Sequence, residues 1–571
     1  MKKCDLVMKG GITSGVVYPR AVAELAKEYR FVNIGGTSAG AIAAAVTAAA
    51  EYARQNGDAN AFDQVDALAK ELAGTPQGDT RSRMLQLFQP SAETRPLYEV
   101  AVRWLETKSI VAVLRALVAR FETYAGPAFA LGTLCAVLIG IAAYQSRPML
   151  GVPLAIVAVV MFVIGGVAAV IAAAIEALLY ANRVLGTQQF GLCNGATHER
   201  WSTPGLTDWL HETIQRISGA KEVLTFGDLE SVDVHLEVMT TNLTIGRPHR
   251  IPFNSAEFFF DKEEMCALFP CEVVERMIGS ATPNREGFYP FPNVPNLPVV
   301  VAARMSLSFP LLLTAVPLRG YDRGRRREKD EALPPEICWF SDGGITSNFP
   351  LHFFDSPIPR WPTFAINLDG WTERYDKEGQ RVQLPEDNSG GVLQRWRAID
   401  GLVAFVTSIV VTMQDWRDNM LLHVPGQRDR IAHILLEDRE GGLNLTMDEQ
   451  QLLQIAGYGV DAAKLLASHF GDQPPAGVTT TWTNHKWVRF LSYMAALQRS
   501  LARFSGAYAG SVDDIVAGKV PPPSYKRVRL SAIRAAMQDF VPHAAADFAH
   551  DPFGGDEMPK PPLNLRPMPP E

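Results

Sequence analysis

The segment Gly36-Thr37-Ser38-Ala39-Gly40 has the residue types and spacing that present a serine as a nucleophile. It follows a short apolar run, residues 31–34, and precedes an alanine-rich stretch, residues 41–53, that predicts a helix. The glycines permit a sharp strand-to-helix turn and the close approach of a substrate. The helix adds free backbone N–H groups and the positive end of its dipole. We therefore predict that Ser38 is a nucleophile.

A glycine-rich segment, Lys9-Gly10-Gly11-Ile12-Thr13-Ser14-Gly15, follows the first predicted strand, Asp5–Met8. Such a loop turns several backbone N–H groups toward one point and suits an anion, either a phosphate or an acyl oxyanion. The nearby Ser38 favours the oxyanion, because negative charge develops where a serine attacks an ester. The segment lacks the Gly-Lys-Ser/Thr end of a P-loop and a full G-x-G-x-x-G, which argues against nucleotide binding.

A carboxylate lies at the end of a later apolar run, in Ile337–Ser341 followed by Asp342-Gly343-Gly344. Alone, Asp-Gly-Gly is typical of a turn. In a chain that also contains a serine elbow and a glycine loop, Asp342 becomes a candidate general base, because serine needs a proton acceptor within hydrogen-bond reach.

These three segments together resemble the patatin-like phospholipase family, and 303–310, Asn348 and Pro350 fit its motifs as well. The resemblance implies an α/β fold with a three-layer α/β/α catalytic domain and a Ser38–Asp342 dyad in place of a triad. It also implies an oxyanion hole in the glycine loop; the expected donors are the N–H groups of Gly10, Gly11, Ile12 and Ala39. The motif glycines are Gly36, Gly40, Gly343 and Gly344.

The glycine loop departs from the family pattern at two positions. Lys9 replaces the first glycine, and Ser14 replaces a basic residue. The backbone donors should survive this change, and Lys9 or Arg20 are the candidates to replace the missing basic side chain.

The resemblance implies acyl transfer through an acyl-serine. Asp342 would accept the proton of Ser38 and later activate water, with no cofactor and no metal. The implied substrate is a membrane phospholipid or related acyl ester. Two alternatives stay open: an acyltransferase of the same fold, and a catalytically inactive membrane scaffold.

Two uncharged runs, Ala125–Tyr144 of 20 residues and Met149–Ile175 of 27, predict a transmembrane helical hairpin, since a span needs about 20 apolar residues. Basic residues precede and follow the hairpin (Lys108, Arg115, Arg120 and Arg183), whereas Arg147 alone lies in its turn. This asymmetry places both ends in the cytoplasm, at the inner membrane if the protein is bacterial. The alternatives are a hairpin buried within a soluble enzyme and one that enters a single leaflet.

The rest of the sequence sets the expected domain organisation. We expect a catalytic domain in two parts (1–75 and 176–370), a helical connection (76–124), the hairpin (125–175), a helical C-terminal region (371–551) and a disordered proline-rich tail (552–571). Runs Val232–Thr241 and Pro298–Ala303 predict strands, and the basic stretch Arg319–Lys329 predicts a solvated loop or a contact with anionic headgroups.

The composition of the chain argues against some classes of binding partner. The net charge of −7 argues against nucleic acid, and the six scattered cysteines show no metal-ligand spacing. The expected partners are the lipid bilayer and, through the C-terminal helices, a protein regulator or a second copy of the chain.

Overall fold

The computed structural model describes most of the chain. The described residues are 1–11, 13–75, 82–107, 109–254, 256–322, 334–371, 379–388, 396, 399–437, 439–442, 444–508, 513–521, 529, 531–537, 553 and 558–560.

The described residues contain thirteen strands. They are β1 (Lys2–Met8), β2 (Tyr29–Gly36), β3 (Gly191–Cys193), β4 (His235–Asn242), β5 (Arg247–Ile251), β6 (Phe259–Phe260), β7 (Tyr289–Pro290), β8 (Leu311–Leu313), β9 (Val316–Gly320), β10 (Glu336–Asp342), β11 (Thr363–Gly370), β12 (Val382–Gln383) and β13 (Ile431–Leu436). Eleven of them form one sheet in the order β12-β13-β11-β1-β2-β4-β10-β9-β6-β7, with β5 paired to β4. Strands β13, β11, β1, β2 and β4 are parallel, and the flanking strands pair antiparallel.

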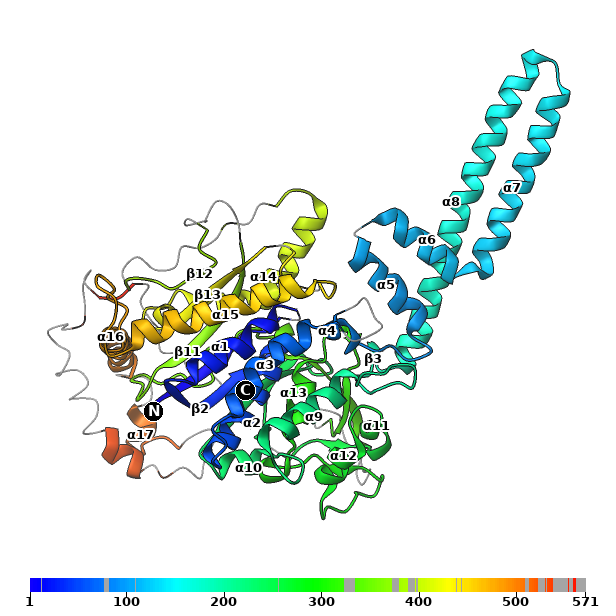
Figure 1. Ribbon diagram of the computed structural model, residues 1–571. Coiled ribbons are helices and arrows are strands. Elements are labelled where there is room, and N and C mark those ends of the chain that lie inside the picture. The colour runs from blue at the N-terminus through cyan, green and yellow to red at the C-terminus, as the bar shows by residue number, and fades with distance from the viewer. Residues whose placement is uncertain are drawn as a thin grey trace.

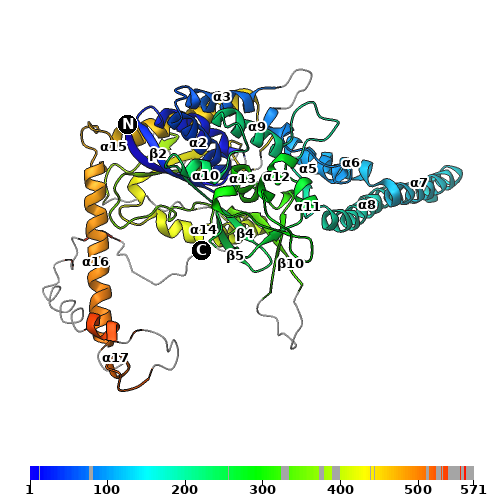
Figure 2. The same ribbon diagram turned by 90° about the horizontal axis from the view of Figure 1, so that it is seen from below.

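Helices cover both faces of this sheet, as Figures 1 and 2 show. They are α1 (Val17–Leu25), α2 (Ala39–Gln55), α3 (Ala61–Ala73), α4 (Arg83–Gln86), α5 (Arg95–Thr107), α6 (Ile110–Arg120), α7 (Glu122–Gln145), α8 (Pro148–Thr187), α9 (Leu206–Ser218), α10 (Phe226–Glu230), α11 (Lys262–Cys266), α12 (Cys271–Ile278), α13 (Val299–Ser306), α14 (Leu402–Leu422), α15 (Glu449–Phe470), α16 (Trp482–Tyr508) and α17 (Asp513–Val516). Helices α1, α2, α3, α9 and α15 lie on one face, and α14 and α16 lie on the other (Figure 2). The α/β/α prediction is confirmed.

The register of β4 brings two distant segments of the chain end to end. Val238 of β4 pairs with β5 on one side and with Gly36 of β2 on the other. Two residues further on, Thr240 pairs with β5 on the first side and with Asp342 of β10 on the other. Strands β2 and β10 therefore meet along the same edge of β4. Their C-terminal ends face each other about two residues apart, on the order of 7 Å along β4.

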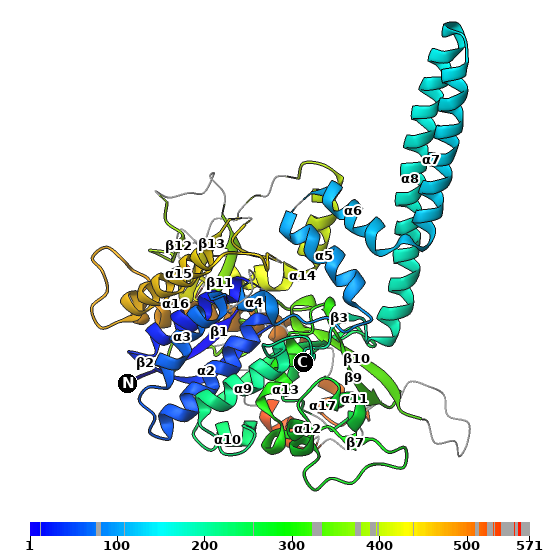
Figure 3. The same ribbon diagram turned by 45° about the vertical axis from the view of Figure 1, so that its right-hand side comes forward.

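The predicted apolar hairpin is formed by α7 and α8, which project away from the sheet (Figures 1 and 3). Both helices are long and apolar enough to cross a membrane, on the evidence of length and composition alone. They cross closely at two glycines, because a Cβ atom added to Gly132 would lie 2.4 Å from the Cα of Gly165. Small residues at such a crossing let two helix backbones pack together.

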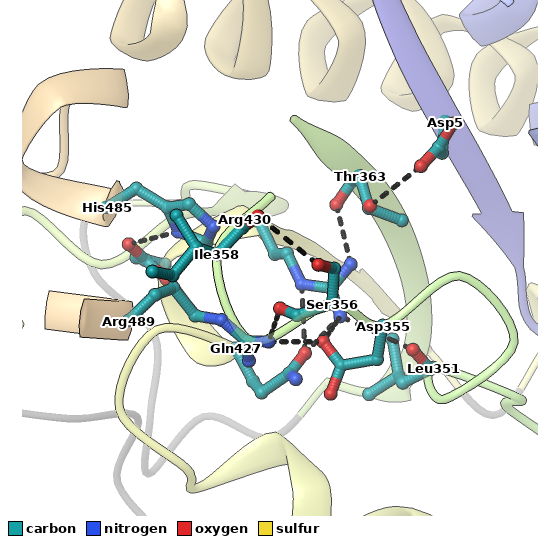
Figure 4. Close-up of polar contacts among 11 residues, drawn as sticks. Asp5, Leu351, Asp355, Ser356, Ile358, Thr363, Gln427, Arg430, His485 and Arg489 are labelled. Carbon is teal, nitrogen blue, oxygen red and sulfur yellow. Dashed lines mark hydrogen bonds and ion pairs between the residues drawn. The ribbon is translucent and has the colours of Figure 1, made fainter. Parts of the chain in front are cut away.

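The C-terminal region is mainly helical, as predicted, but it also supplies β12 and β13 to the central sheet, which the sequence analysis did not predict. A buried polar network ties it to the sheet and is drawn in Figure 4. The Arg430 guanidinium donates to the carbonyls of Thr363 (3.0 Å) and Leu351 (3.3 Å), while Arg489 of α16 donates to Asp355 (2.7 Å). Burial lowers the pKa of Arg430 to about 10. Since a buried cation must be fully hydrogen-bonded, this network fixes the region against the sheet.

Two sequence-based predictions are wrong. The run Pro298–Ala303 is not a strand, because Val299–Ser306 forms α13 and every residue of that helix is buried. The β-branched valines favour a strand in isolation, but tertiary packing overrides that preference. Arg319 is not part of a solvated loop: it lies in β9, is buried, and pairs with Glu264 at 2.7 Å. Residues 323–329 of that loop lie outside the described residues.

Candidate active site

Ser38 lies at a strained turn between β2 and α2. Its φ of 55° and ψ of −127° are a conformation that a non-glycine residue rarely adopts. The two flanking glycines are required by space, because a Cβ atom at Gly36 would lie 2.3 Å from the Gly40 carbonyl oxygen. One at Gly40 would lie 2.3 Å from the Met8 carbonyl oxygen. The sharp strand-to-helix turn that the sequence predicts at Ser38 is therefore present.

Asp342, the last residue of β10, faces this turn with one unused carboxylate oxygen. Its Oδ1 atom accepts a hydrogen bond from the Gly344 N–H at 2.7 Å. Its Oδ2 atom is buried and accepts no hydrogen bond of ordinary geometry from the described part of the chain. Burial raises the pKa of Asp342 from 3.8 to about 7, against the lowering influence of the Ser38 hydroxyl and the Gly344 N–H. A carboxyl with such a pKa can exchange a proton near neutral pH.

The C-terminal end of α13 and the residues that follow it join the serine turn to the aspartate strand. The Ser38 N–H donates to the Ser306 hydroxyl at 3.1 Å, and the Asp342 N–H donates to the Ser308 carbonyl at 2.9 Å. Both serines are fully buried. The sequence analysis matched residues 303–310 to a family motif, but gave no role to Ser306 or Ser308.

The predicted oxyanion donors differ in availability. Gly10 packs against Ser38, since a Cβ atom at Gly10 would lie 3.2 Å from the Ser38 Cβ. Its N–H is already engaged, because it donates to the Asn348 carbonyl at 2.8 Å. The N–H groups of Gly11 and Ala39 donate to no group within the described ranges. Ile12 lies outside those ranges. Among the described candidates, Gly11 and Ala39 are therefore the two whose N–H groups are uncommitted.

Of the two candidate basic residues, only Lys9 lies in this neighbourhood. Its ammonium donates to the Leu368 carbonyl at 3.1 Å and lowers the pKa of the Asp418 carboxyl, which burial raises overall. Arg20 instead forms an exposed ion pair with Asp66 at 3.5 Å.

Two residues of the C-terminal region hold the loop after Asp342. Asp418 of α14 accepts hydrogen bonds from the Asn348 N–H (2.7 Å), the Phe349 N–H (2.8 Å) and the Ser347 hydroxyl (3.0 Å). Gln414, one turn earlier, donates to the Gly344 carbonyl at 2.5 Å. The sequence analysis recognised no chemistry in this region. The signal in the sequence is the polar group Gln414, Asp415, Asp418 and Asn419, which follows an apolar run.

A partly open apolar cavity lies beside the serine turn. Ala39, Gly15 and Leu307 line it next to the turn, and it extends along α2 between α1, α3, α4 and α9. Its walls include Val22, Ile42, Val46, Leu68, Met84 and Trp209. Its apolar lining is typical of a site for an apolar ligand. The described part of the chain contains no group of three or more His, Cys, Asp or Glu side chains that could hold a metal ion.

Comparison with known proteins identifies the class of this domain. Residues 6–122 match the family model described as patatin-like phospholipase. The chain is also 36% identical over 609 aligned residues to the "RpoH suppressor" of Rhizobium meliloti (strain 1021), with 92% of each chain covered. The chain therefore belongs to the same family as that protein, and it carries a patatin-like phospholipase domain. The relative's name does not state an activity.

Among solved structures, VipD from Legionella pneumophila covers 91% of this chain and 79% of its own, at 13% identity and a TM-score of 0.28. A likeness this weak carries no argument about the site.

Proposed function

We propose that this protein is a membrane-associated serine lipid acyl hydrolase that cleaves fatty-acyl esters of phospholipids through Ser38 and Asp342. The observation that carries the proposal is a strained serine beside a buried carboxylate whose Oδ2 atom has no other partner among the described residues. The apolar cavity beside Ala39 supports a substrate with a long apolar chain. Helices α7 and α8 support a tether to the bilayer that contains such substrates.

In the proposed reaction, the Ser38 Oγ atom attacks the ester carbonyl while its proton passes to Asp342 Oδ2. The N–H groups of Gly11 and Ala39 stabilise the negative charge on the carbonyl oxygen. The tetrahedral intermediate then breaks its bond to the alcohol, which takes the proton from Asp342 and leaves as a lysophospholipid. Water attacks the acyl-serine in the same way, giving its proton to Asp342, and the fatty acid leaves as the Ser38 hydroxyl is restored.

The test compares covalent labelling of the detergent-solubilised full chain by a fluorophosphonate probe. We expect wild-type labelling, none in Ser38→Ala, and labelling slowed about a thousandfold or more in Asp342→Asn, because the base is lost. Ser492→Ala is the matched control: Ser492 is a buried serine of α16, and its hydroxyl has no hydrogen-bond partner in the described part of the chain. It should label like wild type.

Two outcomes would overturn the proposal. Wild-type labelling no faster than that of folded Ser38→Ala would identify an inactive scaffold. Labelling followed by transfer of a radiolabelled acyl group to an acceptor alcohol, with no free fatty acid from phosphatidylcholine vesicles, would identify an acyltransferase.

A further inference from the structure

Helix α14 has two unlike faces. Its outward face carries a stripe of exposed apolar side chains, which are Leu402 (78% exposed), Phe405 (52%), Val406 (51%), Ile409 (45%), Met413 (74%) and Met420 (59%). At about 100° per residue, these positions fall within one narrow sector of the helix, and Gln414 and Asp418 fall on the opposite side. The helix thus exposes a stripe of apolar side chains on one side and turns two polar side chains, Gln414 and Asp418, toward the protein on the other.

The inward face contacts the loop that carries the proposed base. Gln414 holds the Gly344 carbonyl, and the Gly344 N–H is the donor to Asp342 Oδ1. Asp418 holds the Asn348 N–H, and the Asn348 carbonyl accepts the hydrogen bond from the Gly10 N–H. One turn of α14 is therefore connected both to the base and to the glycine loop, with a single residue between them in each case. A displacement of α14 would move both.

Two properties of the outward face indicate what covers it: its side-chain composition and its position in the molecule. The stripe combines aromatic and aliphatic side chains, the composition by which interfacial helices bury one face in a bilayer. In Figures 1 and 3, the N-terminal half of α14 rises above the sheet at the height of α5 and α6, on the side toward which the α7–α8 hairpin projects. That hairpin also exposes a continuous apolar surface and has the length to cross a membrane. The same bilayer that receives the hairpin can cover the stripe.

We propose that the apolar stripe of α14 docks on the lipid bilayer, and that this contact sets the catalytic loop through Gln414 and Asp418. The coupling rests on the proposed function, whereas the docking does not. Ser38 then reaches full reactivity only at a lipid surface, where its substrate is found. Asp418 and Gln414 are positioning residues in this scheme, because they act on Asp342 and Gly10 through the backbone of the loop.

Docking is tested without reference to catalysis. An environment-sensitive fluorophore is attached to full-length Met413→Cys and, as a matched site, to Ile245→Cys. Ile245 is also an exposed apolar residue (51%) but lies in the β4–β5 turn. Signals are read against the labelled parent chain with its six native cysteines. Transfer from detergent to phosphatidylcholine–phosphatidylglycerol vesicles should shift the emission at 413 to shorter wavelength. An unshifted emission at 413 would overturn the proposal.

Coupling is tested by the rate at which a fluorophosphonate labels Ser38 in detergent and in the same vesicles. We expect labelling to be about tenfold faster in vesicles for the wild type, within the range of known couplings between sites. Ile409→Asp should lose this stimulation, and Ile245→Asp, the same change at the turn, should keep it. Asp418→Asn should abolish the stimulation while still docking by the fluorescence test. A change that only destabilised the fold would slow both rates alike and preserve their ratio.

The outcomes separate the two ideas. Equal wild-type rates in detergent and vesicles, or equal stimulation in Ile409→Asp and Ile245→Asp, would overturn the coupling and leave the hydrolase intact. No serine-dependent labelling in either medium would overturn the hydrolase and with it the coupling, while docking would still be decided by fluorescence. Conversion of a dimer to a monomer by Ile409→Asp, with unchanged stimulation, would assign the stripe to a second copy of the chain.

Discussion

Helices α2 and α8 are both apolar, yet α2 is mostly buried and α8 is mostly exposed. Twelve of the 17 residues of α2 are buried, whereas only four of the 40 residues of α8 are. Alanine dominates α2, so β2, β4 and α9 approach it closely, and its N-terminus can support Ser38. The larger side chains of α8 face outward, because α7 and α6, its main neighbours, cover only part of its surface. Two apolar helices therefore differ in burial because they have different numbers of neighbouring elements. For α8, we propose that a bilayer covers the side chains that the protein leaves exposed.

The largest contrast between the two regions should come from a matched pair of glycine substitutions. In Gly40→Ala, the new Cβ atom would lie 2.3 Å from the Met8 carbonyl oxygen, so β1 and the glycine loop must move. We expect loss of fluorophosphonate labelling and a free energy of unfolding lower by about 3 kcal/mol or more, as in overpacked cores. In Gly132→Ala, the clash is with Gly165 across the hairpin, and only the spacing of two outward-facing helices must change. Labelling there should stay at the wild-type rate.

Chemical denaturation and labelling of both variants check this contrast, and proteolysis of the hairpin turn reports on the spacing of α7 and α8. If Gly132→Ala also abolished labelling, the hairpin would be part of the frame that holds the site, and the contrast between the regions would fail.

The sequence predicted the features that depend on local chemistry. It predicted the turn at Ser38, the strand that ends at Asp342 and the helices of the hairpin. Glycine spacing and long uncharged runs are each compatible with few local structures. It did not predict what depends on distant contacts. The valines of α13 indicated a strand, and nothing local shows that Ser306 accepts from the Ser38 N–H or that Asp418 holds the loop near Gly344. The engaged N–H of Gly10 likewise depends on a carbonyl at residue 348.

Burial of the Asp342 carboxyl lowers the stability of the folded protein at neutral pH, and this effect can be measured. The pKa of this buried carboxyl rises from 3.8 to about 7. Between these values, the folded state holds a proton that the unfolded state has lost, so stability falls as the pH rises from about 4 to 7 and remains lower above 7. At about 1.36 kcal/mol per pH unit, the full loss is on the order of 4 kcal/mol. Asp342→Asn should recover a large part of it at pH 8 and none below pH 4.

Denaturant titrations of wild type and Asp342→Asn at pH 8, 6 and 4.5 test this expectation. The difference in unfolding free energy should shrink steadily as the pH falls. A difference that does not change with pH would mean that burial does not raise the pKa of Asp342. Water would then reach this carboxyl in the folded protein.

The smallest effect, and the most local, is expected at Ser306, where the core holds the serine turn by one hydrogen bond. Ser306→Ala removes the acceptor of the Ser38 N–H and leaves that group buried without its partner. Such a loss costs about 1–3 kcal/mol, and a slightly misplaced nucleophile should label about tenfold more slowly. Ser492→Ala deletes a hydroxyl that is also buried but has no hydrogen-bond partner in the described part of the chain, and it should change neither quantity. Equal labelling by the two variants would mean that the neighbouring glycines alone fix the turn. The strained φ of Ser38 would then be maintained by packing against Gly10 and α2 rather than by a specific polar contact.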